Sequence, residues 1–326
     1  MAQGLLERGH QIQAVAPDGS ELAAAISIQQ VAGALQVPAQ FQERHTPIAM
    51  PPNPVLGKMW ELARQVQLDY DVIVNFAFDW LPFYLTPFFE TPIAHWISMG
   101  SLNDALDQIA GQVAANFPQA IGVYTRTQAA TFPFAEACYL LGSGLDLSLY
   151  DFCQQPGSAL CWLGRIAPEK ALEDAVAAVD QLGIPLKIMG QIQDQAYWQQ
   201  IQAKFPTAPI EYLGFLGTAE MQSVLRQCRG LLVTSRWVEA FGNVLIEALA
   251  CGVPVIAYAR GGPVEIVRHG QTGWLVEPDS VPDLVKGIQK LDQIDRRTCR
   301  QQAEQEYSLA ALGDRAEQWL HQVKGE

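Results

Sequence analysis

The most informative segment of the chain is Ser235-Arg-Trp-Val-Glu-Ala-Phe-Gly-Asn-Val-Leu-Ile-Glu-Ala-Leu-Ala-Cys-Gly-Val-Pro-Val-Ile-Ala257. It holds two glutamates, Glu239 and Glu247, around an expected helix start. If residues 241–250 are helical, the eight residues between the carboxylates span roughly 12 Å along the axis, about the reach of a sugar diphosphate nucleoside. The flanking residues 230–234 and 252–257 have the apolar pattern of buried strands, so we expect a parallel α/β sheet.

The expected helix start is suited to an anion. Its first amides lack partners inside the helix, and a glycine there lets an anion approach the backbone. A diphosphate would fit, and the glutamates could accept hydrogen bonds from sugar and ribose hydroxyls. Two ordinary acids on a surface helix are the alternative. The residues expected to bind the donor here are Glu239, Phe241, Gly242, Asn243 and Glu247.

These residues belong to a longer ordered run that resembles a known family. The run comprises residues 239–247, 248–256, 261–265 and 273–278. It resembles the donor half of the retaining glycosyltransferases of family 4. The resemblance implies a GT-B fold, an α/β architecture of two Rossmann-like domains with a cleft between them. It also implies that Glu239 touches the transferred sugar and that Glu247 holds the ribose.

A second motif, Leu160-Cys-Trp-Leu-Gly-Arg-Ile-Ala-Pro-Glu-Lys170, indicates a buried strand, a turn at Gly164 and a helix start at Pro168. Arg165 and Lys170 would then lie at the carboxyl end of a strand, where ligands bind in open α/β sheets. Solvated surface charges are the commoner fate of such residues. The family resemblance implies that both bind the donor phosphates, and Gly164 is expected to contact the donor with them. The family often has glycine after this lysine, and here Ala171 stands there.

Composition limits the partners. The chain has 326 residues, 49% of them hydrophobic, and a formal net charge of -13. That charge argues against a nucleic-acid partner, so a phosphate would need local cations such as Arg165, Lys170 and Arg236. We expect no metal, because no cluster has metal-ligand spacing. Six cysteines without paired spacing indicate free thiols in a reducing compartment, hence the cytoplasm. We also expect no signal peptide and no transmembrane segment.

The expected domains are residues 1–153, an acceptor-binding Rossmann-like domain; 154–308, the nucleotide-sugar donor domain; and 309–326, a helix that crosses back to the first domain. The chain opens with the pattern of a helix followed by a strand. The family normally begins one strand and one glycine-rich loop earlier. The resemblance therefore implies a member shortened at its N-terminus, without the first strand of the N-terminal domain.

An aromatic group lies in the first half, most densely over residues 76–89. Such a group is more often core, yet polar residues are interleaved, and a flat heteroaromatic acceptor needs both rings and polar contacts. The expected acceptor contacts are Asn75, Asp79, Trp80, His95 and Ser98. The resemblance implies that His95 lies near the transferred sugar; a satisfied core histidine is the alternative.

This aromatic stretch, with residues 97–102 and 131–134, is similar to a narrower group, the UDP-glucose:tetrahydrobiopterin glucosyltransferases. The resemblance implies transfer of glucose from UDP-glucose to tetrahydrobiopterin with retained configuration, Glu239, His95, Arg165 and Lys170 being the catalytic residues. One alternative is a family 4 transferase with a sugar or lipid acceptor. Another is an inactive nucleotide-sugar-binding homologue.

Overall fold

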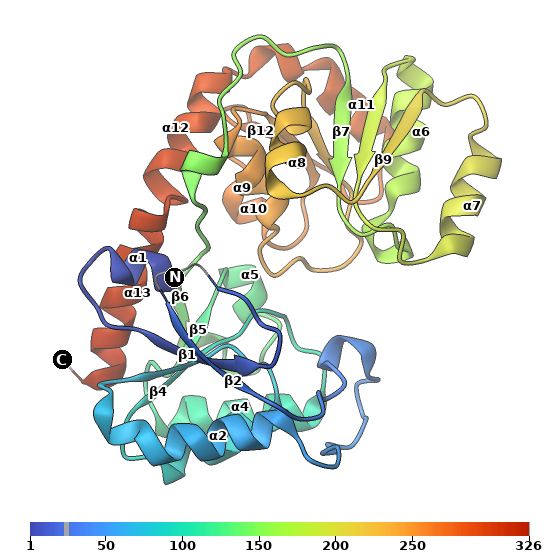
Figure 1. Cartoon of the computed structure of the whole chain (residues 1–326). Helices are drawn as coiled ribbons and strands as arrows, with labels where there is room; N and C mark the ends of the chain where they lie inside the picture. Colours follow the sequence, from blue (N-terminus) through green and yellow to red (C-terminus); the bar gives the residue numbers. More distant parts are fainter. Residues whose placement is uncertain (23–25, 326) are drawn as a thin grey trace. The chain divides into compact units, whose positions relative to one another are not determined.

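The computed structural model describes residues 1–22 and 26–325 and divides into two compact units (Figure 1). The N-terminal unit is Met1–Gly142 with Leu309–Glu326, and the C-terminal unit is Ser143–Ser308. The division therefore falls before the expected boundary at residue 153. The reason is local: the Leu145 amide donates to the Tyr307 carbonyl at 2.7 Å, and the Tyr150 hydroxyl donates to Glu247, so residues after Gly142 pack on the C-terminal unit.

The C-terminal unit is built on a parallel sheet in the order β12-β11-β10-β7-β8-β9. Its strands are β7 (Leu160–Leu163), β8 (Leu186–Met189), β9 (Ile210–Gly214), β10 (Leu231–Val233), β11 (Val255–Tyr258) and β12 (Gly273–Val276). The chain starts in the centre at β7, runs outward to β9, and returns to pair β10 beside β7. The strand order thus reverses between β7 and β10. In open α/β sheets, ligands bind at the carboxyl ends of the strands at such a reversal.

Helices cover this sheet on both sides (Figure 1). They are α6 (Leu172–Leu182), α7 (Gln195–Lys204), α8 (Thr218–Leu225), α9 (Asn243–Ala250), α10 (Pro263–Ile266), α11 (Val281–Gln289) and α12 (Arg296–Glu306). On one face, α6, α7 and α11 pack on the strands in a single apolar core that includes Leu172, Ile188 and Leu284. Each such buried side chain stabilises the fold by about 1.5–3 kcal/mol, which holds the loops at the strand ends on a rigid base.

In the N-terminal unit, the described strands form two parallel sheets, β1-β2 and β3-β4-β5-β6. The elements of this unit are β1 (Gln13–Pro17), β2 (Ser27–Val31), β3 (Ile73–Asn75), β4 (Ile93–Trp96), β5 (Ile121–Val123), β6 (Cys138–Leu140), α1 (Ala2–Leu6), α2 (Val55–Val66), α3 (Trp80–Leu85), α4 (Asp104–Asn116), α5 (Arg126–Ala129) and α13 (Leu309–Lys324). The chain thus opens with a helix and then a strand.

The C-terminal helix α13 packs within the N-terminal unit. Trp319 is fully buried there in an apolar cluster with Leu5 and Leu141, and its indole N–H donates to the Gln119 carbonyl at 2.7 Å. Gly122 leaves room for it, because a Cβ at that residue would come within 2.8 Å of the Trp319 ring. No helix within the described residues is long and apolar enough to cross a membrane.

Candidate functional site

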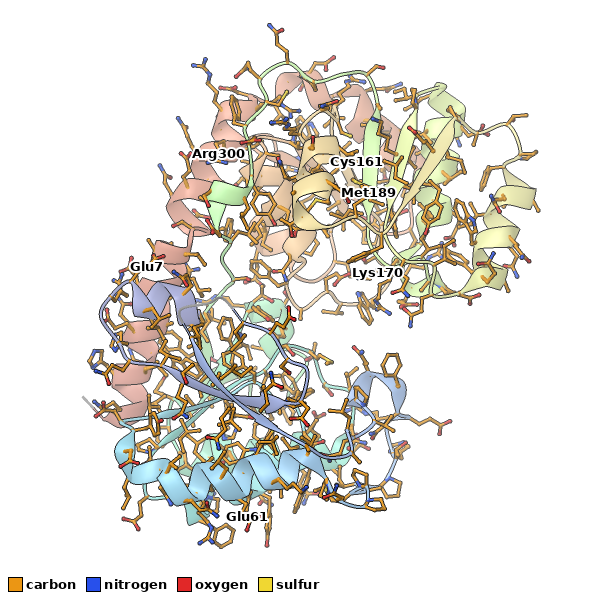
Figure 2. All side chains as sticks on the ribbon, viewed as in Figure 1. Glu7, Glu61, Cys161, Lys170, Met189 and Arg300 are labelled. Carbon is orange, nitrogen blue, oxygen red and sulfur yellow. The ribbon has the colours of Figure 1, made fainter. Side chains whose placement is uncertain are left out.

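The candidate donor site is formed by the two loops that follow β7 and β10, at the reversal of strand order. Thr234 ties the loops together: its hydroxyl donates to the Lys170 carbonyl at 2.9 Å and accepts from the Trp162 indole at 3.1 Å. The Arg236 amide also donates to the Glu169 carbonyl at 2.8 Å. The fold thus brings the cationic motif and the first glutamate together although about 70 positions separate them. Figure 2 labels Lys170 on the loop after β7.

Lys170 and Glu239 form an ion pair at the centre of this site. The Lys170 ammonium contacts the Glu239 carboxylate, and the two side chains are only 16% and 13% exposed. The Ser235 hydroxyl donates to the same carboxylate oxygen at 2.7 Å. Charge-assisted hydrogen bonds of this kind are stronger than neutral ones, so the pair fixes where a ligand would meet one positive and one negative group.

Trp237 is a site residue that the sequence analysis missed. Its ring centre lies 4.6 Å from the Lys170 ammonium nitrogen and 5.6 Å from the Arg165 guanidinium carbon. Arg165 also contacts Gln193 and pairs with Glu169 at 3.2 Å. One aromatic face therefore holds both cations, as cation–π attraction favours. An aromatic residue next to an arginine in the loop after β10 was the available signal.

Arg236, expected as a further phosphate-binding cation, is already paired. Its guanidinium lies 2.6 Å from Glu173, 3.1 Å from Asp174 and 3.7 Å from Asp279. The Tyr258 hydroxyl also donates to Asp174 at 2.8 Å. Arg236 thus anchors the loop after β10 to α6, and its expected contact with a donor phosphate stays a prediction.

The helix α9 begins at Asn243, two residues later than expected, and the expected glycine stands directly before it. Gly242 precedes it at φ +95°, a backbone conformation that favours glycine. In the described structure no side chain caps this helix start, which suits anion binding. Phe241 is buried against Tyr307, whereas Asn243 is exposed. A Cβ on Gly262 would lie 2.1 Å from the Phe241 carbonyl oxygen, so a glycine is needed where the two loops meet.

Glu247 lies in α9 and has a tyrosine partner. The Tyr150 hydroxyl donates to its Oε1 at 3.2 Å. Burial raises the pKa of Glu247, and the Tyr150 hydrogen bond opposes that rise. The pKa of Tyr150 is also raised, first by burial and then by the Glu247 charge. Sequence reasoning missed Tyr150 because 97 positions separate the two residues.

Two smaller features complete the loop after β7. The Gly164 amide donates to the Met189 carbonyl at 3.0 Å, which ties the turn to β8. Ala171 precedes α6 at φ +46° and ψ +49°, the left-handed region, at the position where the resembling family often has glycine. This conformation costs a non-glycine residue about 1–2 kcal/mol, so the departure from the family pattern carries local strain.

His95 and Asn75, expected to contact substrate, lie inside the N-terminal unit. His95 is fully buried, and its ring nitrogens lie 3.1 Å from Asn75 Nδ2 and 2.9 Å from Thr86 Oγ1. Its ring stacks on Phe83, with centroids 4.4 Å apart. Burial lowers the pKa of His95 to about 3. This geometry supports the alternative of a satisfied core histidine, held neutral.

The other expected acceptor contacts are nearer the surface. Asp79 caps α3 by accepting the Leu81 amide at 3.2 Å, and its other oxygen accepts from Gln36 at 2.9 Å. Trp80 stacks on Tyr84 with centroids 4.5 Å apart. Ser98 is exposed beyond the end of β4. Asp79 and Trp80 thus lie together in the N-terminal unit, while Asn75 and His95 form a separate buried pair.

Among the residues that the structure describes, no group of three or more His, Cys, Asp or Glu side chains could hold a metal ion.

The C-terminal unit is similar in sequence to known glycosyltransferases. Residues 157–306 match the family of glycosyl transferases group 1. An uncharacterized glycosyltransferase of Methanocaldococcus jannaschii is 33% identical over 130 residues, which is 40% of this chain and 37% of that protein. Glycogen synthase of Mycobacterium tuberculosis is 28% identical over 162 residues, 47% of this chain and 39% of the synthase. The chain thus spans less than half the length of these curated relatives.

Solved structures show a similar fold over nearly the whole chain. Anabaena HepE in complex with UDP and glucose has a TM-score of 0.75 and 15% identity, covering 96% of this chain and all of that one. Sucrose-phosphate synthase from Thermosynechococcus elongatus also has a TM-score of 0.75, with 18% identity, covering 99% of this chain and 91% of the synthase. Residues 157–306 therefore match the family of glycosyl transferases group 1, and the chain has a GT-B fold.

Proposed function

We propose that the protein is a retaining, metal-independent glycosyltransferase that transfers glucose from UDP-glucose to tetrahydrobiopterin. The observation that carries the transferase assignment is the Lys170–Glu239 pair, with Arg165 held beside it on Trp237, at the reversal of strand order. Its position suits a ligand that carries both a diphosphate and a sugar. The matched family and the UDP complex of a structure with the same fold support a nucleotide sugar as donor.

In the proposed reaction, the acceptor hydroxyl oxygen bonds to the anomeric carbon on the face from which UDP departs. The bond between that carbon and the β-phosphate oxygen breaks, UDP leaves with the electron pair, and the acceptor proton passes to the departing phosphate. Lys170, Arg165 and the uncapped start of α9 would stabilise the developing negative charge. Glu239 would orient the sugar and Glu247 the ribose hydroxyls.

Tetrahydrobiopterin is proposed as the acceptor from the resemblance of the aromatic segment around residues 76–89. Asp79 and Trp80, which lie together in the N-terminal unit, supply a carboxylate and an aromatic surface suited to a pterin. Ser98 as a further acceptor contact and a cytoplasmic location belong to the same proposal. A transferase with a sugar acceptor is the second candidate, favoured by the similarity to the glycogen synthase of Mycobacterium tuberculosis.

The test is UDP release from UDP-glucose by the purified chain, with and without tetrahydrobiopterin, under anaerobic conditions that keep the pterin reduced. We expect pterin-dependent release that EDTA does not abolish, and a product whose anomeric proton shows the α configuration by NMR. Release with simple sugars but not with pterin would support the second candidate. UDP binding with no release for any acceptor would contradict the assignment as an enzyme.

A further inference from the structure

Ser235 and Lys170 meet the same oxygen of the Glu239 carboxylate. The Ser235 hydroxyl donates to Glu239 Oε1 at 2.7 Å, and the Lys170 ammonium contacts that oxygen too. Ser235 is only 6% exposed, so its hydroxyl lies inside the site. Neither of these two bonds uses Glu239 Oε2, and a carboxylate oxygen can accept from a ligand hydroxyl. One oxygen of Glu239 is therefore anchored by the protein while the other is available to a sugar.

The backbone on both sides of the Ser235–Glu239 hydrogen bond is fixed. The Arg260 guanidinium donates to the Ser235 carbonyl at 3.3 Å and is itself paired with Asp279 at 2.6 Å. The Glu239 carbonyl accepts from the Gly262 amide at 2.7 Å. The hydrogen bond between the two side chains therefore starts from two fixed points, and it determines where the carboxylate lies.

Lys170 is a less constant partner for this carboxylate, because the proposed donor competes for its charge. Its ammonium nitrogen lies 4.6 Å from the Trp237 ring centre, and the Arg165 guanidinium lies over the same ring. A diphosphate bound beside these two cations carries more negative charge than one carboxylate and attracts the ammonium more strongly. The contact from Lys170 to Glu239 is then weakened at the stage when the sugar needs an oriented carboxylate.

We propose that Ser235 is a positioning residue that holds Glu239 in place when the diphosphate of a nucleotide sugar draws Lys170 away. The hydroxyl keeps Oε1 anchored through a hydrogen bond to a charged group, which is stronger than a bond between neutral groups. Glu239 Oε2 then accepts from hydroxyls of the transferred sugar. The inference rests on the nucleotide-sugar donor of the proposed function and is independent of the acceptor.

A double-mutant cycle tests this role, because it measures whether one residue acts through another. The full chain is compared with Ser235→Ala, Glu239→Gln and the double variant. Isothermal titration without acceptor gives Kd for UDP and for UDP-glucose, and the ratio of the two measures what the sugar contributes. Ser148→Ala is the matched control, since it removes an exposed hydroxyl that donates to the Asp146 carboxylate at 2.6 Å.

We expect UDP-glucose to bind the wild type more tightly than UDP. Ser235→Ala should reduce this sugar contribution about three- to tenfold, as expected for a lost hydrogen bond to a charged group, while Kd for UDP stays unchanged. In the Glu239→Gln background, Ser235→Ala should have no further effect. Ser148→Ala should behave as the wild type. An unchanged Kd for UDP also shows that the variants keep the folded donor site.

Three results would overturn the positioning role: full additivity of the two substitutions, an equal loss of affinity for UDP and UDP-glucose in Ser235→Ala, or no sugar contribution in the wild type. Pterin-dependent UDP release by the same wild-type sample reports on the proposed function separately. Coupling of Ser235 to Glu239 without such release leaves the positioning role standing and contradicts the acceptor assignment. Release without coupling contradicts the positioning role and leaves the proposed function standing.

Discussion

The Lys170 ammonium group is neutralised by the Glu239 carboxylate inside the candidate donor site. A cation that should bind phosphate is therefore already paired with the carboxylate that should bind the sugar. Replacing either residue leaves the charge of the other without its partner. The roles of Lys170 and Glu239 can therefore be tested by single substitutions.

Glu239→Gln should separate UDP binding from transfer. We expect transfer to fall about a hundredfold or more because the sugar loses its orienting carboxylate. Affinity for UDP alone should be equal or higher, because Lys170 keeps its charge without a competing anion. Isothermal titration with UDP and the release assay measure the two effects.

Lys170→Met should weaken UDP binding as well as transfer, because the phosphates lose a positive charge. Lys204→Met, at the end of α7, is the matched control and should behave as the wild type. Equal loss of UDP affinity in Glu239→Gln and Lys170→Met would contradict the separation of roles.

Trp237 should act as a positioning residue for both cations. Trp237→Leu removes the face on which Arg165 and Lys170 rest, and we expect KM for UDP-glucose to rise roughly 3- to 30-fold, the equivalent of one or two cation–π contacts. Trp237→Phe should recover most of the affinity, which a bulk structural effect would not predict. Trp274→Leu is the control. Trp274, in β12, makes a comparable contact with Lys290, the residue after α11, whose ammonium nitrogen lies 5.1 Å from the Trp274 ring centre. Its loss should leave KM unchanged.

Tyr150→Phe should make UDP binding more sensitive to acid. Burial already raises the pKa of Glu247, and the Tyr150 hydroxyl is the group that lowers it. Without that hydrogen bond the carboxylate takes a proton at higher pH. If the ionised form holds the ribose, the acid limb of UDP affinity should move upward in pH. The measurement is the Kd for UDP from pH 4 to 8, with Tyr70→Phe in the N-terminal unit as the control. Superimposable pH profiles would show that Glu247 does not bind as a carboxylate.

His95 should make the folded protein less stable in acid. Its pKa falls from 6.5 to about 3 on burial, so between these values the unfolded chain binds a proton that the folded chain does not. Stability should therefore decrease as pH falls through this range, with a contribution of up to about 1.4 kcal/mol per pH unit. His95→Gln keeps a polar side chain but cannot titrate.

Urea unfolding of wild type and His95→Gln at pH 7, 6, 5 and 4 checks this contribution. The difference in stability between the two should shift in favour of His95→Gln as the pH falls. His45→Gln, at a side chain that is 85% exposed, is the control. A pH-independent difference for His95→Gln would mean that burial does not shift the pKa of the ring in the folded state.

Much of the fold could be predicted where local pattern and final packing agree. The strands expected at residues 230–234 and 252–257 are β10 and β11, and the helix expected between them at 241–250 is α9, which begins two residues later. The helix α12 was missed because its buried side chains are Arg296, Cys299, Gln302 and Ala303, which give no apolar stripe. The helix α3 was missed because Pro82 and aromatic residues obscure its period, although Asp79 caps it.

Some residues of the candidate site could be predicted from local motifs, and others could not. Glu239, Lys170 and Arg165 could be selected from motifs, since each lies just after a recognisable strand. Trp237 lay within the quoted stretch but was passed over as an ordinary loop residue. Tyr150 could not be found, because its partner, Glu247, is distant in the sequence.

Sequence patterns were enough to predict the α/β class, the strands that flank the quoted stretch, and the motif that places two carboxylates around a helix start, because these depend on residues within a few positions of one another. Which charged groups are paired could be learned only from the packing of distant segments. Lys170 is paired with Glu239, Arg236 is paired with Glu173 and Asp174, and His95 is buried as a neutral ring. Charge state and hydrogen-bond satisfaction depend on which distant side chains packing brings into contact, and no local pattern records that.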